Sequence, residues 1–263
     1  MGALLKYEWK AGIKALLIWS LAVGVMGMLC IVLYKSMEES MAGVAENFAS
    51  MGAFSDAMGM STLSIATLKG YFATEIGTVH SLGSSLFAAS IATVILSKEE
   101  DGHTAEFTYT LPVSRAKVVV VKFISVVMHL MIFTVVCGLL YQVGILLAGE
   151  QGLGKEYLIF MGSQLLMNIE IAAVCFLISA CSRKNKLGFG IGVAMILYVY
   201  DLMARVIPDL KDAIFLSPFS YANATGIFAK TADNATALIF GVGIMLVSAV
   251  AAGVIYCRRD LAS

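Results

Sequence analysis

Six long apolar stretches divide this sequence and restrict what the chain can fold into. A helix that crosses the roughly 30 Å hydrocarbon core of a bilayer needs about 20 mainly apolar residues, because it rises about 1.5 Å per residue. The stretches are continuous rather than alternating, which favours helices over barrel strands, and a helix satisfies its own backbone in lipid. We therefore predict an all-α, polytopic membrane bundle with spans at residues 15–34, 76–96, 118–148, 157–182, 187–203 and 235–257.

Composition and charge agree with a membrane protein. Hydrophobic residues make up 59% of the chain and charged residues only 14%, whereas soluble domains carry about 25% charged residues. The net charge is zero, so no overall field attracts nucleic acid. The cysteines lie in or beside apolar stretches without a zinc-binding spacing, and we predict no metal site: Cys30, Cys137, Cys175, Cys181 and Cys257.

The basic residues indicate the orientation of the spans, because lysine and arginine are retained on the cytoplasmic side. Twelve basic residues fall in one set of alternate segments and six in the other, which has much longer loops. This asymmetry predicts cytoplasmic N and C termini, in agreement with an even number of spans. The twelve are Lys6, Lys10, Lys14, Lys98, Arg115, Lys117, Lys122, Arg183, Lys184, Lys186, Arg258 and Arg259.

The segment before the first span, residues 1–14, has the pattern of an amphipathic helix. An apolar residue recurs at every fourth position, and a stripe of lysines runs beside it: Leu5, Trp9 and Ile13, with Lys6, Lys10 and Lys14. Such a helix is expected to lie in the headgroup region with its lysines at anionic lipid, or to act as a lever on a cytoplasmic partner. A positive-inside anchor that only fixes the topology explains the pattern equally well.

Two connections between spans differ in character. Residues 35–75 form an extracellular loop rich in Met, Ala, Gly and Ser, in which we expect short amphipathic helices at the outer surface. Residues 97–117 form the most polar stretch of the chain. A short helix capped by Asp101 or Thr104 and broken by Pro112 is predicted there, with Ser114 capping the next span. Docking into a groove on another protein and a plain solvated turn are both compatible with this stretch.

The polar connection also carries a resemblance to a known family. This stretch resembles the permeases of the ABC type-2 exporter family. The resemblance lies in acidic residues followed by a glycine and a threonine, in Glu106 before a hydrophobic residue, and in a closing Leu-Pro-Val-Ser-Arg before a span with an early lysine, Lys122. The lead-in around Trp9 and the tail from Tyr256 to Leu261 are similar to those of the family. One departure is His103, which separates a glycine and a threonine that are adjacent in the family pattern.

This resemblance implies a function and a set of partners. Residues 98–115 would contain a coupling helix that contacts a cytoplasmic ATP-binding cassette ATPase, and two permease chains, as a homodimer, would assemble with two ATPase copies. ATP and magnesium would be bound by the partner and no cofactor by this chain. The residues expected at the partner contact are Glu100, Asp101, Glu106 and Phe107, with Arg115 bracing the loop or meeting lipid phosphate.

Polar side chains within a membrane span cost free energy to insert, so each of them is a candidate functional residue. Glu170 lies in the middle of the fourth span and His129 in the third, so a buried pair between antiparallel neighbours is one reading. The pair either fixes helix packing or belongs to a polar patch along a transport route, with Gln164 and Asn168 as companions.

No catalytic constellation is evident in the sequence. Residues 149–156 match a phosphate-binding loop except at the last position, where Glu156 replaces the hydroxyl residue that would bind magnesium. We therefore predict that the chain is not an enzyme. The expected function is export of a hydrophobic or amphipathic substrate, a peptide, lipid or drug, across a bacterial inner membrane. The alternative is a secondary transporter or channel driven by an ion gradient, with Glu170 and His129 as a proton site.

Overall fold

The computed structural model describes residues 2–49, 52, 55, 63–104, 113–231 and 235–259, and every regular element in these residues is a helix. The predicted all-α class is therefore confirmed. The long helices are α1 (Gly2–Ala49), α4 (Gly77–Val94), α7 (Arg115–Leu147), α8 (Lys155–Cys181), α9 (Leu187–Val206) and α12 (Ala235–Arg258). The short elements are α3 (Leu68–Tyr71), the π-helical η1 (Phe72–Ile76), α5 (Lys98–Asp101), the 3-10 helix η2 (Pro208–Leu216), α10 (Pro218–Tyr221) and α11 (Ala224–Ala229).

Within the described residues, five helices are long and apolar enough to cross a membrane. They are residues Gly2–Met37 of α1, and α7, α8, α9 and α12. The chain is thus a multi-pass membrane protein. Helix α4 coincides with the predicted span at 76–96 but is not one of the five, because serine, threonine and histidine side chains interrupt its apolar residues.

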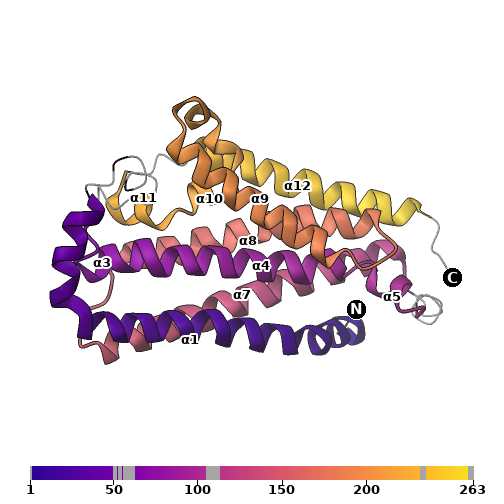
Figure 1. Cartoon of the computed structure of the whole chain (residues 1–263). Coiled ribbons are helices and arrows are strands. Elements are labelled where there is room, and N and C mark those ends of the chain that lie inside the picture. The colour runs from indigo at the N-terminus through magenta and orange to yellow at the C-terminus, as the bar shows by residue number, and fades with distance from the viewer. Residues whose placement is uncertain are drawn as a thin grey trace.

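Helix α4 occupies the middle of the bundle, as Figure 1 shows. It packs against α8, α9 and α1, while α7 lies between α1 and α8, and α12 covers the other side of α8. Its hydroxyl groups bond to its own backbone: Ser81 Oγ donates to the Gly77 carbonyl over 2.7 Å and Thr93 Oγ1 to the Ala89 carbonyl over 2.7 Å. Surrounded by other helices, α4 does not need the apolar surface that a lipid-facing helix needs.

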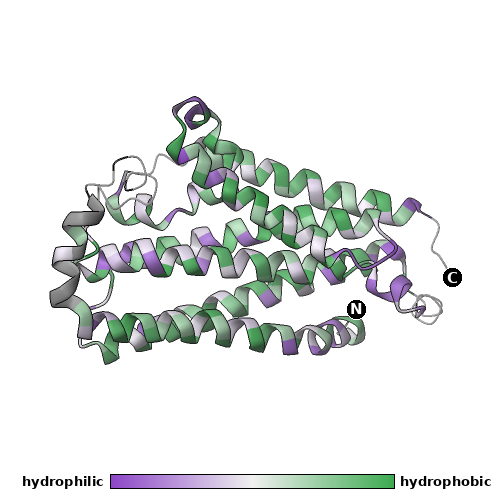
Figure 2. Ribbon diagram, in the orientation of Figure 1, coloured by the Kyte–Doolittle hydropathy of each residue, from purple (hydrophilic) through white to green (hydrophobic). Residues whose placement is uncertain are grey.

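The outer helices present apolar side chains to their surroundings. Figure 2 shows α1 and α12 as mainly hydrophobic ribbons, whereas α4 alternates between hydrophobic and polar residues. Leu17 and Ile18 on α1 and Ile239 and Val247 on α12 are each more than half exposed. In a soluble protein this surface would be a liability, but it is the surface that lipid tails cover.

Helix α1 differs from the sequence-based boundaries. The sequence predicts a surface helix at 1–14, a span at 15–34 and a loop from residue 35, whereas the structure has one helix of 48 residues. At about 1.5 Å per residue this helix is about 72 Å long, more than twice the thickness of the hydrocarbon core. No proline interrupts this part of the sequence, so no residue in it breaks the helix.

The two ends of the bundle carry different elements. The start of α1, the end of α12 and α5 lie at one end, which we call the basic end, whereas α3, α10 and α11 lie at the other (Figure 1). The basic end also holds the first residues of α7 and the connection between α8 and α9. The confirmed N-cap of α7 is here, where Ser114 Oγ accepts from the Lys117 amide. Residues 105–112, which include Glu106 and Phe107, lie outside the described residues.

Candidate coupling site at the basic end

Two adjacent glutamates on α5 point toward different parts of the bundle. The helix follows α4 after a turn at residues 95–97, and it is capped by Gly102, whose amide donates to the Lys98 carbonyl over 3.0 Å. Successive residues on a helix project about 100° apart, because a turn takes 3.6 residues. Glu99 and Glu100, which are 5% and 6% exposed, therefore reach two separate clusters of basic residues.

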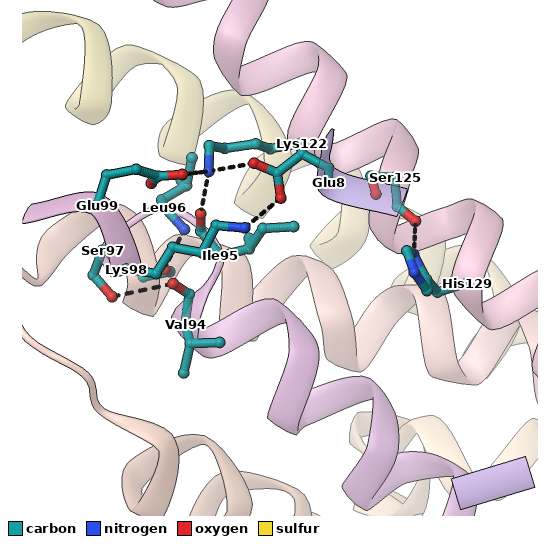
Figure 3. A network of polar contacts seen from close by, with 11 residues as sticks. Glu8, Val94, Ile95, Leu96, Ser97, Lys98, Glu99, Lys122, Ser125 and His129 are labelled. Carbon is teal, nitrogen blue, oxygen red and sulfur yellow. Dashed lines mark hydrogen bonds and ion pairs between the residues drawn. The ribbon is translucent and has the colours of Figure 1, made fainter. Parts of the chain in front are cut away.

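The first cluster surrounds the buried ammonium of Lys122 (Figure 3). Lys122 on α7 is 0% exposed, and its Nζ donates to Glu99 Oε1 over 2.5 Å, to Glu8 Oε1 over 2.9 Å and to the Ile95 carbonyl over 2.7 Å. The second oxygen of Glu8 accepts from Lys98 Nζ over 2.5 Å. The lysine ammonium has three donors, and all three are used. This lysine cluster joins α1, the end of α4, α5 and α7.

The lysine cluster is formally neutral, since two carboxylates face two ammonium groups. Removing charges from water is expensive, and their mutual attraction and hydrogen bonds offset this cost. Both carboxylate oxygens of Glu8 accept hydrogen bonds, whereas Glu99 Oε2 has no partner among the described residues. Loss of one partner from such a buried pair costs about 3–5 kcal/mol because it leaves an uncompensated charge. The cluster therefore holds the basic end in one arrangement as long as all its members are present.

The second cluster gathers around Arg259, directly after α12. Its Nη1 donates to the carbonyls of Ala180 and Ser182, each over 2.7 Å, and its Nη2 pairs with Glu100. The backbone carbonyl of Arg259 in turn accepts from Arg115 Nη1 over 2.7 Å. Partial burial lowers the pKa of the Arg259 guanidinium, although an arginine stays charged at neutral pH. This arginine cluster joins α5 to the ends of α8 and α12 and to the start of α7.

Comparison with known families assigns a class to this helical chain. The family model described as ABC-2 family transporter protein matches residues 3–261. The chain belongs to the ABC-2 transporter family. No curated protein matches it significantly. As an ABC-2 protein, the chain is a membrane component of an ABC transporter, and such transporters work with an ATPase. The family resemblance predicted from the sequence is confirmed.

The predicted partner residues that the structure describes, Glu100, Asp101 and Arg115, do not share one surface of this ABC-2 protein. Asp101 is exposed at the end of α5, as a partner contact requires. Glu100 was predicted beside it, but its burial and its pairing with Arg259 keep it inside the chain, so it is not on an accessible surface in this structure. Arg115 braces the basic end through the carbonyl of Arg259, rather than extending freely from it.

The N-terminal residues of the ABC-2 protein have mixed surroundings. Lys6, Lys10 and Lys14 are exposed on α1, in agreement with a charged outer stripe. Trp9 is partly buried, and its ring lies 4.8 Å from the ring of His129 on α7. The apolar stripe of residues 2–14 thus packs against the bundle at Trp9.

The sequence alone indicates no role for Glu8 and Glu99, two members of the lysine cluster. The available signals were a single glutamate within the basic lead-in and an isolated lysine, Lys122, inside the apolar run of α7. A charge within an apolar run needs a partner. The sequence did not indicate which of several acidic residues would supply it.

Glu170 and His129 of the ABC-2 protein do not pair. Glu170 Oε2 accepts from Tyr221 Oη over 2.7 Å and faces Gly241 on α12. His129 Nδ1 lies 2.6 Å from the Ser125 carbonyl, and its ring faces Gly12 on α1. Although α7 and α8 are neighbours, these two side chains leave them on different sides.

Gln164 and Asn168 lie one turn apart on α8, and both are 0% exposed. Gln164 Nε2 donates to Ser81 Oγ over 2.7 Å and to the Ala222 carbonyl over 2.8 Å, which ties α8 to α4 and to the segment after α10. Asn168 finds no hydrogen-bond partner among the described residues. The Gln164 contacts are those of a packing residue, and the structure does not join Gln164 to His129.

Proposed function

We propose that the chain is the permease subunit of an ABC exporter and that a separate ATPase subunit drives it through the connection between α4 and α7. The observation that carries this proposal is the double anchoring of α5. Glu99 binds the lysine cluster, with α1 and α7, and Glu100 binds the arginine cluster, with α8 and α12. A force on residues 98–115 therefore acts on four long helices through two short ionic contacts.

The proposal includes a sixth crossing by α4, with both termini in the cytoplasm. Helical residues run from Leu68 through η1 to Val94, and α4 with the turn after it runs beside α8 from Ser81 at Gln164 to Leu96 at Ser179. The constant offset of these two contacts, 83 positions in each case, indicates that α4 and α8 run in the same direction. Since α8 is apolar and long enough to cross, we infer that the helical segment from Leu68 to Val94, which runs parallel to it, crosses the same layer.

The clusters also support a mechanism for transmission. We propose that ATP-driven closure of the partner displaces the exposed part of the 98–115 connection, including Asp101, Glu106 and Phe107. The buried carboxylates of α5 then move the basic ends of α1 and α7 relative to those of α8 and α12. Two such chains, each with its ATPase, would alternate access to a path between them in the bacterial inner membrane.

A hydrophobic or amphipathic cargo agrees best with the apolar surface of the spans. The alternative, transport driven by an ion gradient, used Glu170 and His129 as a proton site. These residues face different helices, so the alternative lacks its paired site.

Co-purification tests the proposal and separates docking from transmission. An ATPase encoded with this chain is expected to co-purify with the wild type and to be lost when Glu106 and Phe107 are both changed to Ala. The Glu99→Gln variant is expected to retain the ATPase but to lose stimulation of ATP hydrolysis by the permease, because its contact lies inside the chain. Transport by the chain alone in ATP-free vesicles would refute the exporter proposal.

A further inference from the structure

A cavity of about 410 Å³ lies beside the lysine cluster, between α1, α4, α7 and the start of α9. Its walls are mainly apolar and include Ala15 and Trp19 on α1 and Ile91 on α4. Glu8, Lys98 and Asn185 line it toward the basic end. Its volume falls within the roughly 300–1,000 Å³ of ligand sites, and it combines an apolar wall with a few polar groups, as such sites do.

Two buried polar side chains also line this cavity. Ser125 is 1% exposed and His129 3% exposed, and neither Ser125 Oγ nor His129 Nε2 has a hydrogen-bond partner in the described part of the chain. The other ring nitrogen of His129, Nδ1, faces the Ser125 carbonyl and therefore donates to it. Figure 3 shows His129 bonded to the Ser125 carbonyl, to one side of the lysine cluster. Unpaired polar atoms this deep are rare in proteins and call for an explanation.

The cavity is open at its basic end. Ala11 on α1 and Asn185 and Leu187 at the start of α9 line it and are exposed, so it communicates with the outside between α1 and α9. From Glu8 to Trp19 it follows 12 residues of α1, a rise of about 16 Å. That length is close to half of the roughly 30 Å hydrocarbon core, which is the depth of one leaflet.

The charge around the opening is positive. The lysine cluster itself is neutral, but Lys98 keeps 28% of its side chain exposed and its ammonium has donors beyond the one bonded to Glu8. The connection after α8 adds three exposed cations next to Asn185: Arg183, Lys184 and Lys186. Basic groups at the mouth of a pocket between membrane helices on the cytoplasmic side are suited to an anionic lipid headgroup.

We propose that this cavity binds one anionic phospholipid of the inner leaflet. An acyl chain lies along Ala15, Trp19 and Ile91, and the phosphate group meets Lys98 and the basic connection before α9. Bound there, the lipid contacts the lysine cluster that holds α1 and α7 to α5, so the headgroup sits beside the proposed transmission contacts. The location of the headgroup rests on the proposed cytoplasmic basic end, but binding itself requires neither the ATPase nor transport.

The chain has two tryptophans, Trp9 and Trp19, and the second lines the cavity, so fluorescence reports directly on occupancy. In a Trp9→Phe background purified in non-ionic detergent, we expect saturable quenching of Trp19 by phosphatidylglycerol with brominated acyl chains. Affinity for brominated phosphatidylcholine is expected to be about fivefold weaker, from the contribution of one basic residue near a headgroup. The Lys98→Gln substitution is expected to remove this preference.

Two cavity-filling variants and one matched control complete the test. Ala15→Phe on α1 and Ser90→Leu on α4 occupy the cavity from opposite walls and are expected to abolish saturable quenching. Leu17→Phe, on the same helix but 54% exposed and outside the cavity, is expected to leave it unchanged. Equal quenching by both lipids, or quenching that survives both filling variants, would show that Trp19 meets only boundary lipid and would overturn the proposal.

Discussion

Glu8 and Lys122 form an ion pair of 2.9 Å between residues 114 positions apart, and this contact fixes the N-terminal part of α1 against α7. The pair is closed to solvent on both sides, with side chains 1% and 0% exposed. Lys122 also binds Glu99, so one ammonium determines how three helices meet. A displacement of α5 must therefore either carry α1 and α7 with it or break the contacts of Lys122.

Substitution of Lys122 by Met should be strongly destabilising, because it leaves Glu99 Oε1 without its buried donor. Breaking a buried pair costs about 3–5 kcal/mol, which for a chain of this size corresponds to a fall in Tm of roughly 10 °C. Thermal melting in detergent measures this fall. Lys117→Met, an exposed lysine on the same helix, is the control and should change Tm little. Combining Lys122→Met with Glu99→Gln should recover part of the loss, and equal Tm values for all variants would contradict the role of the cluster.

Gly241 and Gly243 on α12 offer a matched pair for the surroundings of Glu170. A Cβ at Gly241 would lie 2.4 Å from Glu170 Oε2, whereas one at Gly243 would meet nothing within 4 Å. Gly241→Ala must displace the carboxylate that accepts from Tyr221, and we expect a loss of about 1–3 kcal/mol, typical of overpacking. Gly243→Ala should be neutral or slightly stabilising, because alanine favours helix. Melting temperatures decide the matter, and a larger effect at Gly243 would show that α12 packs differently.

Arg258 and Arg259 are neighbours with different surroundings. Arg259 donates to two carbonyls and to Glu100, and a lysine lacks the planar fork that reaches all three. Arg259→Lys should therefore speed hydrogen exchange of α5 and of the residues after α8 by about tenfold or more, on the scale of a lost charge-assisted bond. Arg258→Lys is the control, since Arg258 is exposed. Unchanged exchange in Arg259→Lys would mean that the arginine cluster does not hold α5.

The long helices were predictable from the apolar runs of the sequence. The partners of the charged residues were not predictable from it. The bounds of α7, α8, α9 and α12 lie within three residues of the predicted spans, because a run that must satisfy its backbone in lipid ends where polar residues begin. The continuity of α1 was missed, since both the span and its flanks permit helix and only tertiary packing decides where it ends.

In the candidate site, too, the sequence did not indicate the direction in which side chains point. The polar connection at 97–117 stood out from composition alone, yet Glu99 and Glu100 differ only in the direction in which they leave one turn of helix. A pair between Glu170 and His129 was predicted because both are polar residues in consecutive spans. The rotation of each helix about its axis turns Glu170 toward α12 and His129 toward α1. Because α7 and α8 are apolar on all faces, their sequences gave no pattern from which to predict that rotation.

The position of the C terminus tests whether α4 crosses the membrane. If α4 crosses, the spans number six and the two termini lie on the same side; if it does not, five crossings place them on opposite sides. We expect a fluorescent protein fused after residue 263 to fold in the cytoplasm and fluoresce. Alkaline phosphatase, which is active outside the inner membrane, should be active when fused after Gly152, between α7 and α8, and inactive after Asn185, between α8 and α9. Active phosphatase at the C terminus and at Asn185, with an inactive fusion at Gly152, would show that α4 stays on one side of the membrane and that the basic residues after α8 face outward.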